Sequence, residues 1–194
     1  SRRRQRQMCI RDRYLIKPYD YNIPRFINFL QENGIRLKSS SKIFKIKNNY
    51  FDYGTLLIPV VGQSKKPEII FDLLTEISEK TGIDVYSLSS GYEDNIGFGS
   101  NSFTTIKKPK IGLIVGNGIR SYDAGEIWHL FDTRYGIPIT KLDVKNLNRT
   151  NLTEYSHIIL PSYSGSSINV DIIKDYLKGG GLSLIHISEP TRRR

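Results

Sequence analysis

Sulfur is almost absent from this chain of 194 residues, which has one cysteine, Cys9, and one methionine, Met8. From Tyr14 onward there is no thiol, which excludes a disulfide, a thiolate metal site and a cysteine nucleophile there. Long apolar runs are also lacking, since none approaches the roughly 20 residues that a membrane-spanning helix needs. We therefore expect no membrane span.

The two ends of the chain have an unusual coding pattern. Met8-Cys9-Ile10-Arg11-Asp12 is the translation of ATG TGT ATA AGA GAC, which lies inside a transposase end sequence used to prepare DNA libraries. The run from Leu182 to Arg192 is the translation of the same end sequence reversed. Because the two matches stand in opposite orientations at opposite ends, we expect residues 1–13 and 182–194 to be translated sequencing adapters. The protein proper then extends from about Tyr14 to Gly181 and is open at both ends.

Positive charge predominates, at +10 for the whole chain, and by itself would indicate a nucleic-acid or anionic-membrane partner. Residues 1–13 contain six arginines and one aspartate, and residues 182–194 contain three arginines and one glutamate. These ends supply +7 of the total and leave +3, an ordinary value. We therefore expect no nucleic-acid partner.

The first of two segments, residues 14–103, is predicted to be a small α/β segment that ends at a break near Thr104–Lys110. One helix is expected after Pro24, closed by Asn33-Gly34, and a second from Pro67 to Thr81-Gly82. Strands are predicted at residues 14–16, 43–47, 56–60 and 84–88, with Asn48-Asn49 as the turn between the second and the third. Residues 90–102 are rich in Gly, Ser and Asn and are expected to form a loop.

In the second segment, residues 110–181, predicted strands alternate with helices. Strands are expected at 110–115, 138–144 and 157–161, helices at 123–135 and 168–178, and a short helical connection at 147–155. This alternation predicts right-handed crossovers and a parallel sheet with helices on both faces. The sheet is expected to be incomplete after Gly179-Gly180-Gly181, although the apolar run 182–187 can imitate its next strand. Because an unpaired edge and uncovered helix faces would remain, we expect residues 14–181 alone to be poorly soluble.

The turn Gly116-Asn117-Gly118 follows a strand and precedes a helix, where open α/β sheets bind ligands and helix N-termini attract anions. Ser121 stands where a dinucleotide-binding fingerprint has its third glycine, so a ligand-binding loop and a plain tight turn both remain open. Asp123 with Glu126 suits an N-terminal cap of the helix that follows and a favourable interaction with its dipole.

Glu126 and His129 are one helical turn apart, so they share a face of that helix. They could pair or bind a ligand, or they could form a solvated face with a local hydrogen bond. Trp128, next to them, is expected to be a packing residue rather than a platform for a substrate.

Zinc peptidases need three protein ligands, typically His-x-x-Glu and a more distant His. The one such motif in the sequence is His186-Ile187-Ser188-Glu189, which lies in the C-terminal adapter region. His129 and His157 have no glutamate at that spacing. The sequence therefore predicts no metal ligands and no catalytic residues in this chain.

A series of short runs in a fixed order resembles a known family. The runs are Phe51–Val60, Gly82–Tyr86, Gly99-Ser100, Lys108–Ile111, Ser121–Asp132, Asn148-Arg149, Tyr155 and Leu160-Pro161. In this order and spacing they resemble the region after the peptidase domain in large bacterial zinc carboxypeptidases of the carboxypeptidase A superfamily. The most specific run is Tyr122–His129, and the resemblance covers nearly all of Tyr14–Gly181.

The resemblance implies that residues 110–181 form a truncated class I glutamine amidotransferase-like, flavodoxin-like domain, usually regarded as non-catalytic. It also implies that the zinc ligands and the catalytic glutamate precede this chain, and that the nucleophile-equivalent position follows Gly181. The chain would be an accessory C-terminal fragment, itself inactive and without a cofactor, of a secreted zinc metallocarboxypeptidase. That parent would be periplasmic or extracellular, and its peptidase domain would bind the peptide substrate and release C-terminal residues. The alternatives are a small-molecule or sugar-binding amidotransferase-like module of another enzyme, and a purely structural domain.

Overall fold

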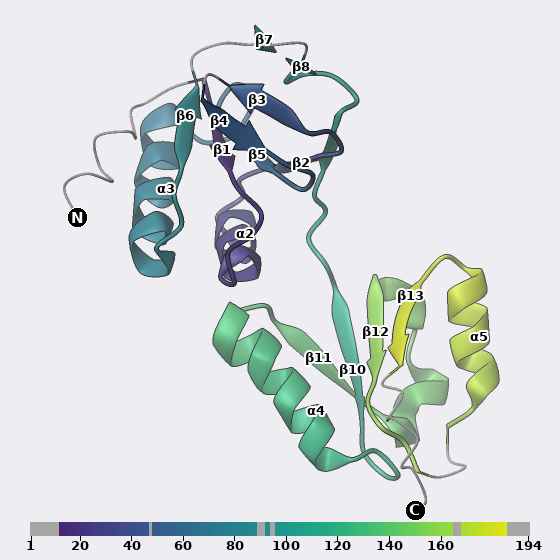
Figure 1. Cartoon of the computed structure of the whole chain (residues 1–194). Helices are drawn as coiled ribbons and strands as arrows, with labels where there is room; N and C mark the ends of the chain where they lie inside the picture. The colour runs from purple at the N-terminus through teal and green to yellow at the C-terminus, as the bar shows by residue number, and fades with distance from the viewer. Residues whose placement is uncertain (1–11, 47, 89–91, 94–95, 165–167, 186–194) are drawn as a thin grey trace, which may run out of the picture. The chain divides into compact units, whose positions relative to one another are not determined.

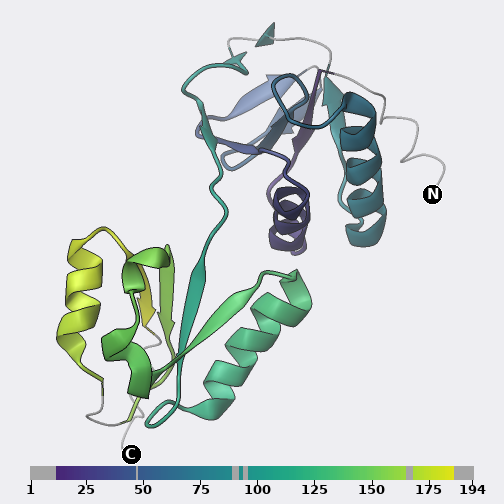
Figure 2. The same ribbon diagram turned by 180° about the vertical axis from the view of Figure 1, so that it is seen from behind.

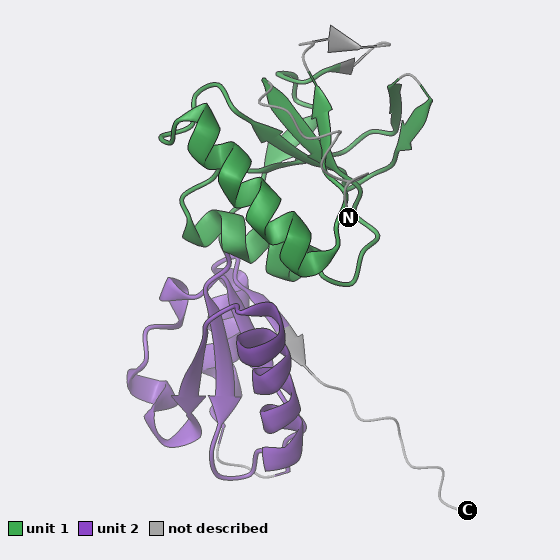
Figure 3. Ribbon diagram, turned by 90° about the vertical axis from the view of Figure 1, so that its left-hand side faces the viewer, with its two compact units in different colours: residues 1–108 green, residues 109–194 purple. Residues whose placement is uncertain are grey.

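The computed structural model describes residues 12–46, 48–88, 92–93, 96–164 and 168–185. The chain divides into two compact units, residues 1–108 and 109–194 (Figure 3). Each unit has its own sheet and its own hydrophobic core. Among the helices of the described residues, none is long and apolar enough to cross a membrane.

The first unit is built on a five-stranded sheet in the order β6-β1-β5-β2-β9. All four neighbouring pairs are antiparallel. The strands are β1 (Arg13–Ile16), β2 (Lys38–Ser40), β5 (Leu56–Pro59), β6 (Tyr86–Leu88) and β9 (Phe103–Thr105). Strand β9 lies at the predicted break, where no strand was expected.

Two helices pack on this sheet, α2 (Ile23–Glu32) and α3 (Pro67–Thr81). Each carries a proline in its first turn, where the missing N–H costs no helical hydrogen bond. Gly82 ends α3 with φ +76°, a left-handed conformation that glycine adopts without steric cost. The predicted positions of both helices are confirmed.

The two faces of this sheet have different coverings because side chains alternate along each strand. Tyr14, Ile16 and Ile58 belong to the cluster that includes the buried residues of α2 and α3. Leu15 and Leu57 point to the other face, where they join Phe44, Phe51, Phe98 and Phe103. The aromatic rings of this second cluster are stacked, tilted or edge to face, with centroid distances of 5.2–6.0 Å.

The predicted pairing of residues 43–47 with residues 56–60 around the turn Asn48-Asn49 is wrong. Strand β3 (Phe44–Ile46) forms a hairpin with β4 (Asn49–Phe51), whereas β5 pairs with β1 and β2. The chain reverses at residues 52–55, where the Asp52 carbonyl accepts from the Thr55 N–H at 3.1 Å and from its hydroxyl at 2.6 Å. Within the expected loop 90–102, β7 (Tyr92–Glu93) and β8 (Ile96–Gly97) form a further short hairpin.

The Asp52 turn is held to the segment after β1 by the Tyr19 hydroxyl, which donates to the Asp52 carboxylate. This hydrogen bond holds the pKa of Asp52 below its usual range and raises the pKa of Tyr19 to about 12. Asp52 also accepts from the Tyr53 N–H at 2.7 Å. The start of the run Phe51–Val60 therefore has a structural role in this unit.

The second unit contains a four-stranded parallel sheet in the order β11-β10-β12-β13. Its strands are β10 (Ile111–Val115), β11 (Ile139–Asp143), β12 (His157–Leu160) and β13 (Leu182–Ile185). The predicted parallel sheet is confirmed. Strand β13 consists of residues that were expected to imitate a strand, and Leu182 is 59% exposed there.

Helices cover both faces of this sheet, with α4 (Ser121–Trp128) on one side and α5 (Val170–Lys178) on the other (Figures 1 and 2). A π-helix (His129–Tyr135) continues α4, and two 3₁₀ turns (Val144–Arg149 and Leu152–Glu154) connect β11 to β12. Ile111 and Leu113 belong to the core under α4, and Ile114 belongs to the core under α5. The predicted two-sided covering is confirmed.

The helix predicted at 123–135 begins earlier and is less regular than expected. It starts at Ser121, after the N-cap residue Arg120, and changes from α to π geometry after Trp128. No described side chain caps it, so the predicted cap by Asp123 is wrong, although Asp123 lies in the first turn, where the predicted dipole interaction places an acidic residue. The cause is position, because Asp123 is the third residue of the helix and not the residue before it.

Candidate functional site

The carboxyl edge of the parallel sheet is where Gly116 and Gly118 lie. Strand β10 continues along the chain to β11 on one side and has β12 on its other side, so the strand order reverses between β10 and β12. In open α/β sheets this reversal point is the usual place for a ligand, because the two connections leave in opposite directions. The predicted position of the glycine turn is therefore at the topological switch point.

The loops after β10 and β12 are joined by backbone hydrogen bonds. The Ser164 N–H donates to the Gly118 carbonyl at 2.8 Å, and the Arg120 N–H donates to the Ser162 carbonyl at 2.9 Å. Ile119 and Tyr163 form an isolated antiparallel bridge between them. These backbone groups are thus occupied by the neighbouring loop.

Both glycines have a structural reason to be glycine. Gly116 has φ +110°, and a Cβ atom there would lie 2.8 Å from Oδ1 of Asp143. Gly118 has φ +83°, and its Cβ would lie 2.7 Å from Cε2 of Tyr163. The tight turn, one of the two alternatives left open by the sequence, accounts for both residues without a ligand.

Two buried polar atoms belong to residues that flank the switch point. Neither Oδ2 of Asp123 nor Oγ of Ser162 has a hydrogen-bond partner within the described part of the chain. Asp123 lies in the first turn of α4, and Ser162 follows β12 by two residues. The predicted capping role of Asp123 is not found, and no role was predicted for Ser162.

Glu126 and His129 lie elsewhere, on the exposed side of α4 and its π-helical continuation. They line a shallow depression of about 460 Å³ together with Ser121, Tyr122, Gly125, Leu130 and Arg134. The predicted shared face is confirmed. Neither Gly116 nor Gly118 lines this depression, so the four candidate residues belong to two separate places.

Within this depression Glu126 interacts with Tyr122 rather than with His129. A hydrogen bond to the Glu126 carboxylate raises the pKa of the Tyr122 hydroxyl. In the described residues no hydrogen bond or ion pair joins Glu126 to His129. The geometry matches the solvated helix face with a local hydrogen bond.

Trp128 is a packing residue, as predicted. It is partly buried against the cluster of Ile111, Leu113 and Ala124. The ammonium of Lys141 on β11 lies 4.4 Å from the centre of the indole, a cation–π distance. The ring is thus held between the sheet and a charged side chain.

The residues present do not fit a zinc centre, which requires three protein ligands. No group of three or more His, Cys, Asp or Glu side chains that could hold a metal occurs among the residues with described positions. His157 begins β12, at the amino edge of the sheet, where its Nδ1 lies 2.8 Å from the Ser156 hydroxyl. The motif His186–Glu189 lies outside the described residues.

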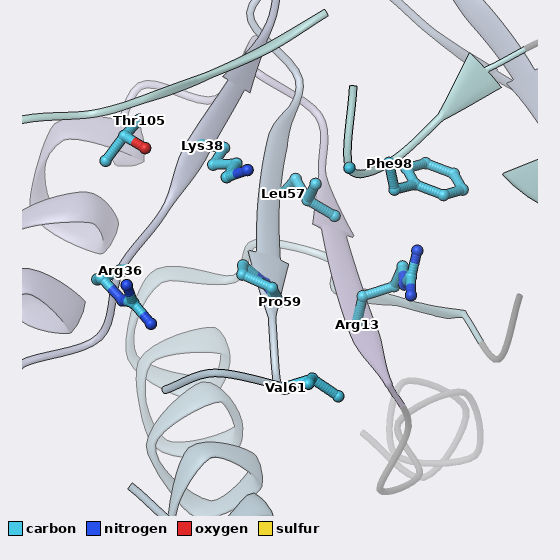
Figure 4. Close-up of a pocket in the computed structure, with 9 residues that line it drawn as sticks. Arg13, Arg36, Lys38, Leu57, Pro59, Val61, Phe98 and Thr105 are labelled. Carbon is cyan, nitrogen blue, oxygen red and sulfur yellow. The ribbon is translucent and has the colours of Figure 1, made fainter. Parts of the chain in front are cut away.

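A cavity in the first unit was not predicted from the sequence. It has a volume of about 310 Å³ and lies on the face of the sheet that carries Leu57 and Phe98 (Figure 4). Its lining includes three cationic side chains, Arg13, Arg36 and Lys38. The polar run Lys38-Ser39-Ser40 was not predicted to be a strand, so the sequence gave no indication of this cavity.

Comparison with models of protein families, with curated proteins and with solved structures found no match.

Proposed function

We propose that this chain is an accessory α/β region of a zinc metallocarboxypeptidase, positioned after the peptidase domain of its parent protein. The observation that carries the proposal is the ordered series of sequence runs from Phe51 to Pro161, with Tyr122–His129 as its most specific member. That run forms α4 from its second residue onward, together with the first residue of the π-helix. The proposal assigns the zinc ligands and the catalytic glutamate to the peptidase domain.

The strand order supports the finer assignment of residues 110–181 to the class I glutamine amidotransferase-like, flavodoxin-like domains. Within residues 110–181 the strands β11, β10 and β12 stand in the order 2-1-3, which is the beginning of the flavodoxin-like order 2-1-3-4-5. The packing of helices on both faces agrees with a doubly wound fold. In this proposal the domain is non-catalytic, and the parent acts on peptides outside the cytoplasm.

One observation favours the alternative of a small-molecule or sugar-binding module. The depression beside α4 combines a carboxylate, an imidazole and the Tyr122 hydroxyl, which are groups that hydrogen-bond sugars and other polar ligands. Its shallow form limits the surface that a ligand could bury, and small-molecule sites usually bury most of their ligand. We therefore rank this function second.

The test is the genomic DNA on both sides of the coding region. We expect an upstream metallopeptidase domain with a His-x-x-Glu motif and a later histidine, and we expect residues 1–13 and 182–194 to be missing from the genome. An upstream glycosidase barrel would support the alternative instead. Genomic codons for both arginine-rich ends would overturn the adapter assignment.

A further inference from the structure

One face of the antiparallel sheet is covered over only part of its length. The hairpin β3–β4 and the rings of Phe98 and Phe103 pack on Leu15 and Leu57. Beyond Leu57, towards Pro59 and Val61, the same face opens into the 310 Å³ cavity. Val61 is 77% exposed there, although valine is more often buried.

Strand register places the cations of this cavity on one face. Lys38 pairs with Leu57 and with Thr105, and Arg13 pairs with Pro59. Directly paired residues of antiparallel strands point to the same face, and so do residues two apart on one strand. Arg13 thus lies on one side of β5 and Lys38 on the other, and Arg36, two residues before Lys38, lines the cavity on the Lys38 side (Figure 4).

The backbone beside Arg36 is fixed by Gln63. The Gln63 Oε1 accepts from the Arg36 N–H at 2.9 Å, and its Nε2 donates to the Arg36 carbonyl at 2.8 Å and to the Pro59 carbonyl at 2.9 Å. One amide side chain therefore holds the Arg36 segment against the end of β5. A backbone fixed in this way loses less conformational freedom when the cavity binds a ligand.

Among the described residues, nothing balances the positive charge of this cavity. No aspartate or glutamate is among the described residues that line it. Arg13, Arg36 and Lys38 form no ion pair in the described portion of the chain, and the Arg13 guanidinium lies 5.3 Å from the centre of the Phe98 ring. Three cations around one cavity repel each other, and a bound anion would offset this repulsion.

We propose that this cavity binds a small organic oxyanion, a carboxylate or a phosphate monoester. Its charged group would lie between Arg36 and Lys38, and its apolar part would contact Leu57, Val61 and Phe98. Guanidinium groups bind such oxygen pairs through two parallel hydrogen bonds, and the Thr105 hydroxyl adds a polar group to the same lining. The volume is at the lower end of the range for small-molecule sites, which favours a ligand the size of one substituted ring.

This proposal rests on Arg36 and Lys38, because Arg13 is among residues 1–13, which we expect to be translated adapter sequence. The matched control is Lys45, an exposed cation on β3 of the same unit that does not line the cavity. The proposal is independent of the peptidase assignment and stands or fails separately from it.

The experiment is titration calorimetry of the full chain with phenyl phosphate, with benzoate and with the neutral analogue benzamide. We expect at least one of the two anions to bind with one-to-one stoichiometry and benzamide not to bind. Arg36→Gln and Lys38→Gln should each weaken binding about tenfold or more, the usual effect of losing a charge-assisted hydrogen bond. Lys45→Gln should bind as the unsubstituted chain does, and circular dichroism establishes that each variant is folded.

The two anions distinguish a phosphate site from a carboxylate site, and either result supports the proposal. Absence of binding by both anions at millimolar concentration would overturn it. Equal weakening by all three substitutions would also overturn it, because the anion would then respond to general surface charge.

Discussion

Gly116 and Gly118 occupy positions where any side chain would meet a neighbouring one. Both have positive φ, where a Cβ atom costs roughly 1–2 kcal/mol by itself. At Gly118 the added atom would also lie 2.7 Å from the ring of Tyr163, whose hydroxyl accepts from the Ile168 N–H at 3.0 Å. The contact between the two loops of the switch point therefore depends on a residue without a side chain.

We expect Gly118→Ala to lower the free energy of unfolding of the second unit by about 2–5 kcal/mol, the sum of the backbone and overpacking costs. Gly180→Ala is the control, because Gly180 has φ +89° in the same unit and open space around its Cβ position. That control should lose only about 1–2 kcal/mol. Urea unfolding followed by fluorescence of Trp128, the single tryptophan, measures both. Equal losses would mean that the Tyr163 contact is unimportant.

At the scale of the element, the helices were predictable and the strand pairing was not. Local features mark α2 and α3, namely a proline in the first turn and a positive-φ glycine at or just after the end. By contrast, β5 pairs with β1 and β2, which are far from it in sequence. Strand β3 pairs with the neighbouring β4, whose first residue is the polar Asn49. Partner choice is set by tertiary packing, which a single sequence does not display.

In the candidate sites, too, the features set by local sequence were predictable and those set by strand pairing were not. Glu126 and His129 share a helix face because the helical period places them there, and Gly116 follows a buried strand. The basic cavity was missed because it depends on cross-strand register between β1, β2 and β5. Of these strands, β2 lacks the apolar alternation that marks a strand.

Strand β13 gives an element-scale prediction. It is the partner of β12 at one end of the parallel sheet, from Leu182 opposite His157 to Ile185 opposite Leu160. A chain ending at Gly181 would leave this side of β12 unpaired, and an exposed strand edge promotes association. We expect the chain shortened to residue 181 to elute with a larger apparent mass than the full chain in light-scattering chromatography. Shortening to residue 185 keeps β13 and is the control; a monomer from both would contradict the prediction.

At the scale of the whole molecule, each unit has its own hydrophobic core and a different architecture. The first is an antiparallel sheet with two helices on one face and an aromatic cluster on the other. The second is a parallel sheet with helices on both faces. We propose that these units bind a ligand and give structural support, and that a metal-bearing domain of the parent hydrolyses peptides.

The most direct test of this assignment is the zinc content and peptidase activity of the full chain after equilibration with zinc chloride and removal of free metal. We predict far less than one zinc per chain by atomic emission and no release of phenylalanine from the C-terminus of a synthetic peptide. Hydrolysis needs at least three ligands around the metal and an open position for water. One zinc per chain together with hydrolysis that a chelator abolishes would contradict the account.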